Sequence, residues 1–86
     1  MILSATIYWF DKKTEAFKGK TSIDEIHEKV IREILNVPDN LPFPKWMEGS
    51  YSLAPPQLEA LKPFTGHQYN LSKYDYFIGK WEIKNA

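Results

Sequence analysis

The chain has 86 residues, of which 43% are hydrophobic and 15% aromatic, and its 11 basic residues balance its 11 acidic residues. A chain of this length forms one domain with a small core, and its zero net charge argues against nucleic-acid binding, which normally needs a basic excess for phosphate contacts. It has no cysteine and no apolar run of membrane-spanning length, which excludes thiol catalysis and predicts a cytoplasmic protein with no membrane segment.

The first elements expected are two strands that form a hairpin. Apolar and polar side chains alternate along residues 2–10, with many β-branched and aromatic residues among them. This period of two is typical of a strand. The polar residues 11–14 form a turn, and residues 15–20 can return as a short second strand that ends near Gly19.

A helix over residues 22–35 is the next prediction. Ser22 is followed three residues later by Glu25, the spacing of a capping box, in which two side chains satisfy free amides at the start of a helix. Apolar residues then recur at spacings of three and four, as in an amphipathic helix. The residues expected to pack against a sheet are Ile26, Val30 and Ile34.

The second half of the chain alternates between loops and shorter elements. Three prolines make residues 36–46 a loop, and a strand is expected around residues 50–53. Pro55-Pro56 precede a short second helix, because proline is favoured in the first helical turn, and this helix is expected to stop by Pro63. Residues 73–83 are apolar on both faces, which predicts a central or covered strand.

These elements predict a single α+β domain over residues 1–86, with the order β-β-α-β-α-β along the chain. No repeat, linker or low-complexity tract divides the sequence. We expect a small, mainly antiparallel sheet of three or four strands with one long amphipathic helix packed on it.

Few residues in the sequence could carry catalysis or bind a metal. The two histidines, His27 and His67, stand far apart, and without cysteine they lack the spacing of a zinc site. No Gly-x-Ser-x-Gly elbow or phosphate-binding glycine loop occurs. Asp75 lies in an aromatic strand and could be a perturbed acid, although a structural, hydrogen-bonded role is favoured. The sequence therefore predicts a protein that is not an enzyme and that holds no cofactor or metal.

Acidic residues gather on the outer face of the expected helix. Asp24, Glu25 and Glu28 lie there, with Lys29 and Arg32 four residues after the two glutamates. One interpretation is a solvated helix face with ion pairs between residues i and i+4. The other is a recognition face for a basic partner, whose association the charges would speed.

Short stretches in both halves of the chain resemble a family of small uncharacterised bacterial proteins. They are Trp9-Phe10-Asp11, Gly19, Tyr51-Ser52-Leu53, Gln57, Leu61 and Tyr74-Asp75-Tyr76-Phe77. Members of this family are similar in kind to the immunity proteins that neutralise toxins of contact-dependent growth inhibition and related polymorphic systems. The resemblance implies an immunity-type protein that binds a cognate toxin domain.

A partner-binding surface is the functional site that this interpretation requires. The candidates are the acidic residues Asp24, Glu25 and Glu28, together with Phe43 and Trp46, which the proline-rich loop could present. A small nucleic-acid-binding module that uses Lys and Tyr on a sheet face stays open as an alternative, as does a homodimer or another interaction module.

Overall fold

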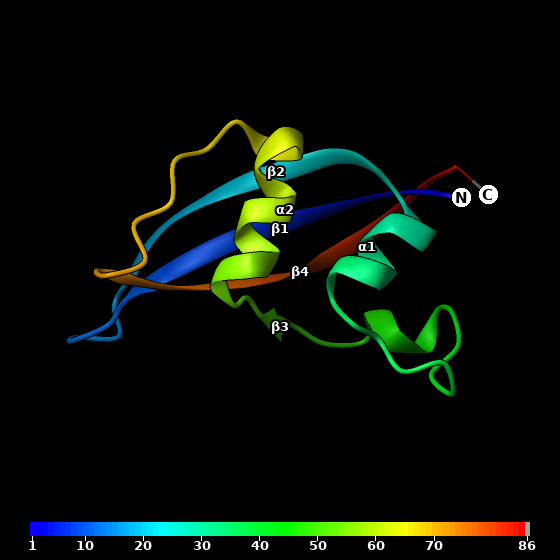
Figure 1. Cartoon of the computed structure of the whole chain (residues 1–86), viewed down its shortest axis with the longest axis horizontal. Coiled ribbons are helices and arrows are strands. Elements are labelled where there is room, and N and C mark those ends of the chain that lie inside the picture. The colour runs from blue at the N-terminus through cyan, green and yellow to red at the C-terminus, as the bar shows by residue number, and fades with distance from the viewer. Residues whose placement is uncertain (86) are drawn as a thin grey trace.

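The computed structural model describes residues 1–85 and contains one four-stranded antiparallel sheet and two α-helices (Figure 1). The elements are β1 (Ile2–Asp11), β2 (Phe17–His27), α1 (Glu28–Ile34), the 3-10 helix η1 (Lys45–Met47), β3 (Tyr51–Ser52), α2 (Pro55–Thr65) and β4 (Tyr74–Asn85). The strands lie in the order β2-β1-β4-β3. The expected α+β class and the antiparallel sheet are confirmed, whereas the expected chain order lacked η1.

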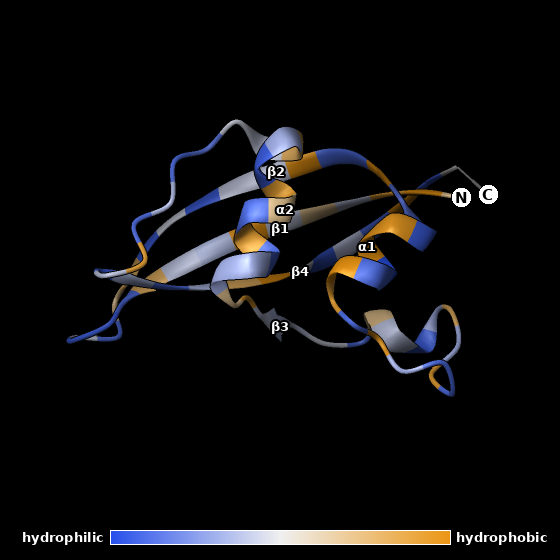
Figure 2. Ribbon diagram, viewed as in Figure 1, coloured by the Kyte–Doolittle hydropathy of each residue, from blue (hydrophilic) through white to orange (hydrophobic). Residues whose placement is uncertain are grey.

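The helices cover only one face of this sheet. Figure 1 shows α1 and α2 side by side in front of the strands, and in Figure 2 each helix carries both hydrophobic and hydrophilic residues. The inward positions of β1, which are Leu3, Ala5 and Ile7, are buried beneath them. Alternate side chains of a strand point to opposite faces, so the intervening positions of β1 lie on the face that no helix covers.

Four register shifts interrupt the pairing of β1 with its neighbours, and two of them are bulges opposite Ser4 and Ala5. In β2, Ala5 pairs with Ile23 and Leu3 pairs with Ile26, so two residues of β2 stand opposite Ser4. In β4, Thr6 pairs with Gly79 and Ser4 pairs with Glu82, so Lys80 and Trp81 stand opposite Ala5. An extra residue of this kind bends the strand and redirects side chains. Both bulges therefore change which residues face the core.

The expected long helix over residues 22–35 is wrong. Residues up to His27 continue strand β2, and α1 has only seven residues. The bulge explains the error, because it places Ile23 and Ile26 on the same face of a strand although they are three residues apart. That spacing imitates a helical stripe. Ile26 is buried as expected, but from β2, and Val30 is 40% exposed.

The second helix, α2, was expected to stop by Pro63 but runs on to Thr65. Proline near the end of a helix removes a single backbone hydrogen bond, and α2 continues for only two further residues. Gly66 then ends the helix in the left-handed conformation, with a φ of 64°, and its N–H donates to the Lys62 carbonyl. At the other end, the Gln57 side chain accepts a hydrogen bond from the Ala54 N–H, at 2.8 Å.

Candidate functional site

Four aromatic rings lie together on the uncovered face of the sheet. Phe10 is at their centre, with ring centroids 5.8 Å from Phe77, 5.8 Å from Phe17 and 5.8 Å from Tyr8. Tyr8 also stacks on Phe77 at 6.0 Å. We call Tyr8, Phe10, Phe17 and Phe77 the aromatic platform. Phe17 is 56% exposed, so the platform presents apolar surface to solvent.

Strand register assembles the platform from three strands. Tyr8 of β1 pairs with Phe77 of β4, and Phe10 of β1 pairs with Phe17 of β2. Residues directly opposite in an antiparallel pair share a face and lie within side-chain contact. A register shift between Trp9 and Phe10 leaves Lys18 without a partner in β1 and places Phe17 opposite Phe10. The pairing therefore brings Phe77 of β4 beside three rings of the hairpin that β1 and β2 form.

A hollow of about 460 Å³ adjoins the platform. It is lined by Thr6, Tyr8, Phe10, Phe17, Lys20 and Lys80. Lys20 pairs with Tyr8 in the sheet, and Lys80 reaches this face from the β4 bulge, where its φ is 53°. Among the residues that the structure describes, neither lysine forms an ion pair. The hollow thus combines an aromatic wall with two unpaired cations.

The segment before β3 lies close to the platform, at Tyr8. The hydroxyl of Tyr8 hydrogen-bonds to Ser50 Oγ, which ties the ring to the segment before β3. A Cβ added to Gly79 would lie 2.7 Å from the same Ser50 oxygen. Glycine at position 79 therefore leaves open the space through which the Ser50 side chain reaches Tyr8.

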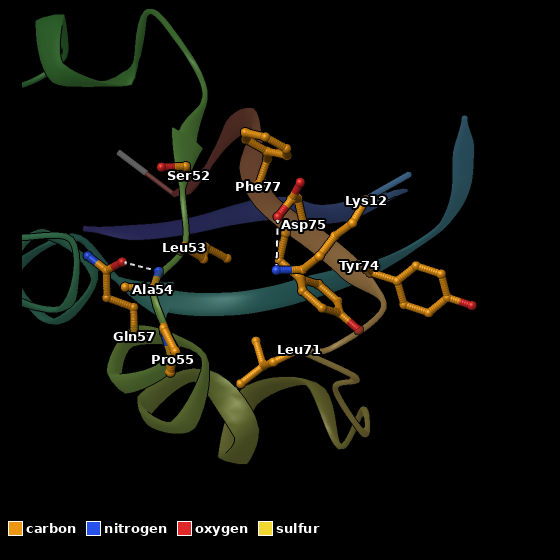
Figure 3. Close-up of a pocket in the computed structure, with 11 residues that line it drawn as sticks. Lys12, Ser52, Leu53, Ala54, Pro55, Gln57, Leu71, Tyr74, Asp75 and Phe77 are labelled. Atoms are coloured by element: carbon orange, nitrogen blue, oxygen red, sulfur yellow. Dashed lines mark hydrogen bonds and ion pairs between the residues drawn. The ribbon is translucent and has the colours of Figure 1, made fainter. Parts of the chain in front are cut away.

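A second hollow of about 510 Å³ lies between α2 and β4 and shares Phe77 with the platform (Figure 3). Asp75 and Lys12 form an ion pair of 3.5 Å in its wall, and Leu71 also lines it. The Asp75 carboxylate is more than half exposed and has this lysine as its partner. The lining contains no histidine, and its ionisable side chains include Lys12 and Asp75.

The two histidines are not brought together. His27 is exposed at the junction of β2 and α1, although the sequence placed it within a helix. His67 stacks on Trp9 with centroids 4.5 Å apart and lies edge-on to Tyr69 at 5.2 Å. Burial raises the pKa of Tyr69 above that of an ordinary tyrosine, and a hydrogen bond with Thr65 partly opposes this effect. Across residues 1–85, no group of three or more metal-ligating side chains occurs.

The structure corrects the placement of the partner-binding residues expected from the sequence. Asp24 and Glu25 are exposed as expected, but they form the β2 bulge and not the face of a helix. Trp46 is only 1% exposed, so the loop does not present this ring to a partner. Its indole N–H donates to Glu28 Oε2 at 2.9 Å. Phe43 is half-buried against the core.

Glu28 was expected on an exposed face and is instead half-buried. It accepts the Trp46 hydrogen bond and lies 3.8 Å from Arg32, the i,i+4 pair that the sequence predicted. The expected site therefore divides into an exposed acidic bulge on β2 and a structural contact on the helical side. Whether the bulge binds a partner stays a prediction.

Sequence reasoning missed the aromatic platform as a site, although its signal was present. Tyr8 and Phe10 occupy the polar phase of the alternation in the first strand, and Phe77 gives the last strand a second apolar face. An apolar residue at an outward position of a strand indicates either a second covering layer or an exposed patch. The structure shows an exposed patch, because no helix covers this face of the sheet.

No helix within residues 1–85 is both long enough and apolar enough to cross a membrane. Comparison with protein families matches residues 4–79 to the family described as Domain of unknown function (DUF7683). The matched region begins in β1 and ends at Gly79 of β4, so it includes all four rings of the platform. Because the match covers most of the sequence, the chain belongs to the DUF7683 family.

Proposed function

We propose that the protein works by binding a partner protein through its aromatic platform, as an immunity-type protein that neutralises a cognate toxin domain. The observation that carries this proposal is the placement of four aromatic rings on a sheet face that no helix covers, with Phe17 56% exposed. Exposed apolar patches on small domains are typical of interaction sites. Aromatic side chains are enriched among the residues that dominate binding energy.

The cost of the arrangement supports a binding role. A domain of this length has few large apolar groups available for its core. This chain nevertheless places Tyr8, Phe10, Phe17 and Phe77 on the solvent side, where each ring contributes less to stability than a buried one. A partner that covered the platform would bury these rings and recover that contribution on association.

The immunity role draws its support from the sequence resemblance, and the platform draws its support from the geometry. A nucleic-acid-binding module is a second candidate, because Lys20 and Lys80 flank aromatic rings on a sheet face. Such a combination of cations and stacking platforms serves single-stranded nucleic acids in other folds. The zero net charge favours the protein partner.

Growth rescue tests this proposal. Each reading frame adjacent to the gene is expressed in a sensitive bacterial host, alone and together with the protein. We expect one frame to arrest growth and the wild-type protein to restore it. Phe17→Ser should abolish the rescue, since truncation of an anchor of this kind costs about 2 kcal/mol or more of binding free energy.

Phe64→Ser is the matched control. Phe64 is 38% exposed on α2, on the helical side of the molecule, so its loss should leave rescue intact. Melting temperatures of both variants, measured alongside, separate lost binding from lost folding. If no adjacent frame is toxic, or if Phe17→Ser rescues as well as wild type, the proposal fails.

A further inference from the structure

We infer that the partner segment bound at the platform is an acidic, extended peptide stretch, which places a carboxylate at Lys20 and Lys80 and an apolar side chain against Phe10 and Phe17. This inference rests on the proposed function and specifies the chemistry of the partner. The two lysines come from β2 and β4, on either side of β1. They therefore flank the same stretch of the central strand, at Thr6 and Tyr8.

Charge complementarity points to an acidic occupant. Six residues line the hollow, and the only ionised side chains among them are the two lysines. The carboxylates near the platform lie outside this hollow, and Asp11, Glu15 and Asp75 line a separate hollow with Phe10 and Phe77. Asp75 pairs with Phe10 in the sheet and forms its ion pair with Lys12, and Glu82 stands opposite Ser4. A ligand carboxylate in the hollow would meet cations that have no competing ion pair among the described residues.

The backbone of β4 is shaped so that Lys80 reaches this face. The bulge opposite Ala5 holds Lys80 in the left-handed region, with a φ of 53°, which a residue with a long side chain adopts at some cost. The same bulge turns Trp81 onto Trp46, at 5.0 Å between ring centroids. One extra residue thus sends a cation to the open face and an aromatic ring toward the core.

A peptide fits this surface better than a nucleic acid does. Two lysines could neutralise only a short run of phosphates, whereas nucleic-acid affinity grows with the number of phosphate contacts. The one arginine, Arg32, lies on the helical side and donates to the Pro38 carbonyl at 2.9 Å. The two lysines of the hollow can therefore pair with one or two carboxylates, and its aromatic wall can contact apolar side chains.

Peptide selection tests the inference with the intact chain. A random library of peptides of about eight residues, long enough when extended to cross the three long strands, is selected against the wild-type protein. We expect the enriched peptides to carry Asp or Glu next to an aromatic or aliphatic residue. Their affinity should fall about fivefold in Lys20→Gln and again in Lys80→Asn, and salt should weaken it. Asparagine is chosen at position 80 because it tolerates the left-handed conformation.

Lys29→Gln is the control, because Lys29 is exposed on α1 and loses the same charge away from the platform. Its affinity for the enriched peptides should equal that of the wild type. The inference is overturned if no peptide is enriched, if the enriched peptides lack acidic residues, or if both platform variants bind them as tightly as wild type. Binding of a ten-nucleotide thymidine oligomer in place of the peptides would also overturn it in favour of a nucleic acid. Loss of growth rescue in Phe17→Ser without acidic enrichment would leave the proposed function standing and remove only this inference.

Discussion

The indole N–H of Trp46 donates a hydrogen bond to the Glu28 carboxylate at 2.9 Å, and this contact joins the loop that contains η1 to the first turn of α1. Trp46 lies edge-on to Trp81 at 5.0 Å and to Tyr51 at 6.3 Å. Its carbonyl accepts a hydrogen bond from the Tyr51 hydroxyl, at 2.5 Å. The ring that the sequence suggested as an exposed anchor is therefore the centre of a packed cluster.

Truncation of this ring should unfold much of the protein. We expect Trp46→Ala to lower the free energy of unfolding by about 3–5 kcal/mol, because it leaves a large cavity. Trp46→Phe should cost less, since it keeps most of the packing but leaves Glu28 without its indole donor. Urea denaturation of the three proteins measures the difference. Equal stability of Trp46→Ala and wild type would show that the ring does not occupy the core.

The sequence identified Trp46 as important but not its role. Tryptophan suits a core and an interface equally well, and a proline-rich loop gives no periodicity that would distinguish the two. The pairing with Glu28 spans 18 positions along the chain. Only the folded arrangement of α1 and η1 places these two side chains together.

Neighbouring residues of α1 provide the sharpest test of the corrected helix. Val30 is 40% exposed, whereas Ile31 is fully buried. Val30→Asp should therefore change the melting temperature little, while Ile31→Asp should prevent folding, because it buries a charge without a partner. Thermal unfolding followed by circular dichroism compares the two variants. The opposite ranking would restore the longer helix that the sequence predicted, in which Val30 faces the sheet.

The alternation of apolar and polar residues predicts the buried face of strand β1 but not the bulge in strand β2. Its alternation places Leu3, Ala5 and Ile7 in the core, as the structure confirms. The bulge at Asp24 and Glu25 could not be predicted, because one inserted residue converts a period of two into a spacing of three. The same limit applies to the platform, which depends on the register between strands and not on any single stretch of sequence.

Two glycines allow backbone strain to be separated from side-chain crowding. At both Gly49 and Gly66, an added Cβ would have no atom within 4 Å. Gly66, which ends α2, also has a φ of 64°. Gly66→Ala should lower the free energy of unfolding by about 1 kcal/mol, because only the left-handed backbone resists it. Gly49→Ala should be close to neutral. Chemical denaturation of both variants gives the comparison, and equal effects would mean that the Gly66 conformation carries no cost for alanine.

The hairpin turn between β1 and β2 should give the protein a measurable dependence on pH. Asp11 Oδ1 accepts hydrogen bonds from the Lys13 N–H at 2.8 Å and the Thr14 N–H at 3.0 Å. The bond from Thr14 and then that from Lys13 hold the pKa of this carboxyl below that of an ordinary aspartate. A carboxyl with a lowered pKa binds fewer protons in the folded state. Its contribution is complete above the pKa of the unfolded chain and is lost as pH falls through the folded-state pKa.

Asp11→Asn isolates this contribution, because the asparagine oxygen can accept the same two hydrogen bonds but carries no charge. Wild type should melt at a higher temperature than the variant near pH 7, and the difference should close as pH falls to about 2. Asp39→Asn serves as control, since Asp39 is exposed and forms no ion pair within the described chain. Asp11→Asn should show the larger change with pH of the two variants. A constant difference for Asp11→Asn would show that the turn is held by the oxygen alone, and that its negative charge adds nothing to the stability of the hairpin.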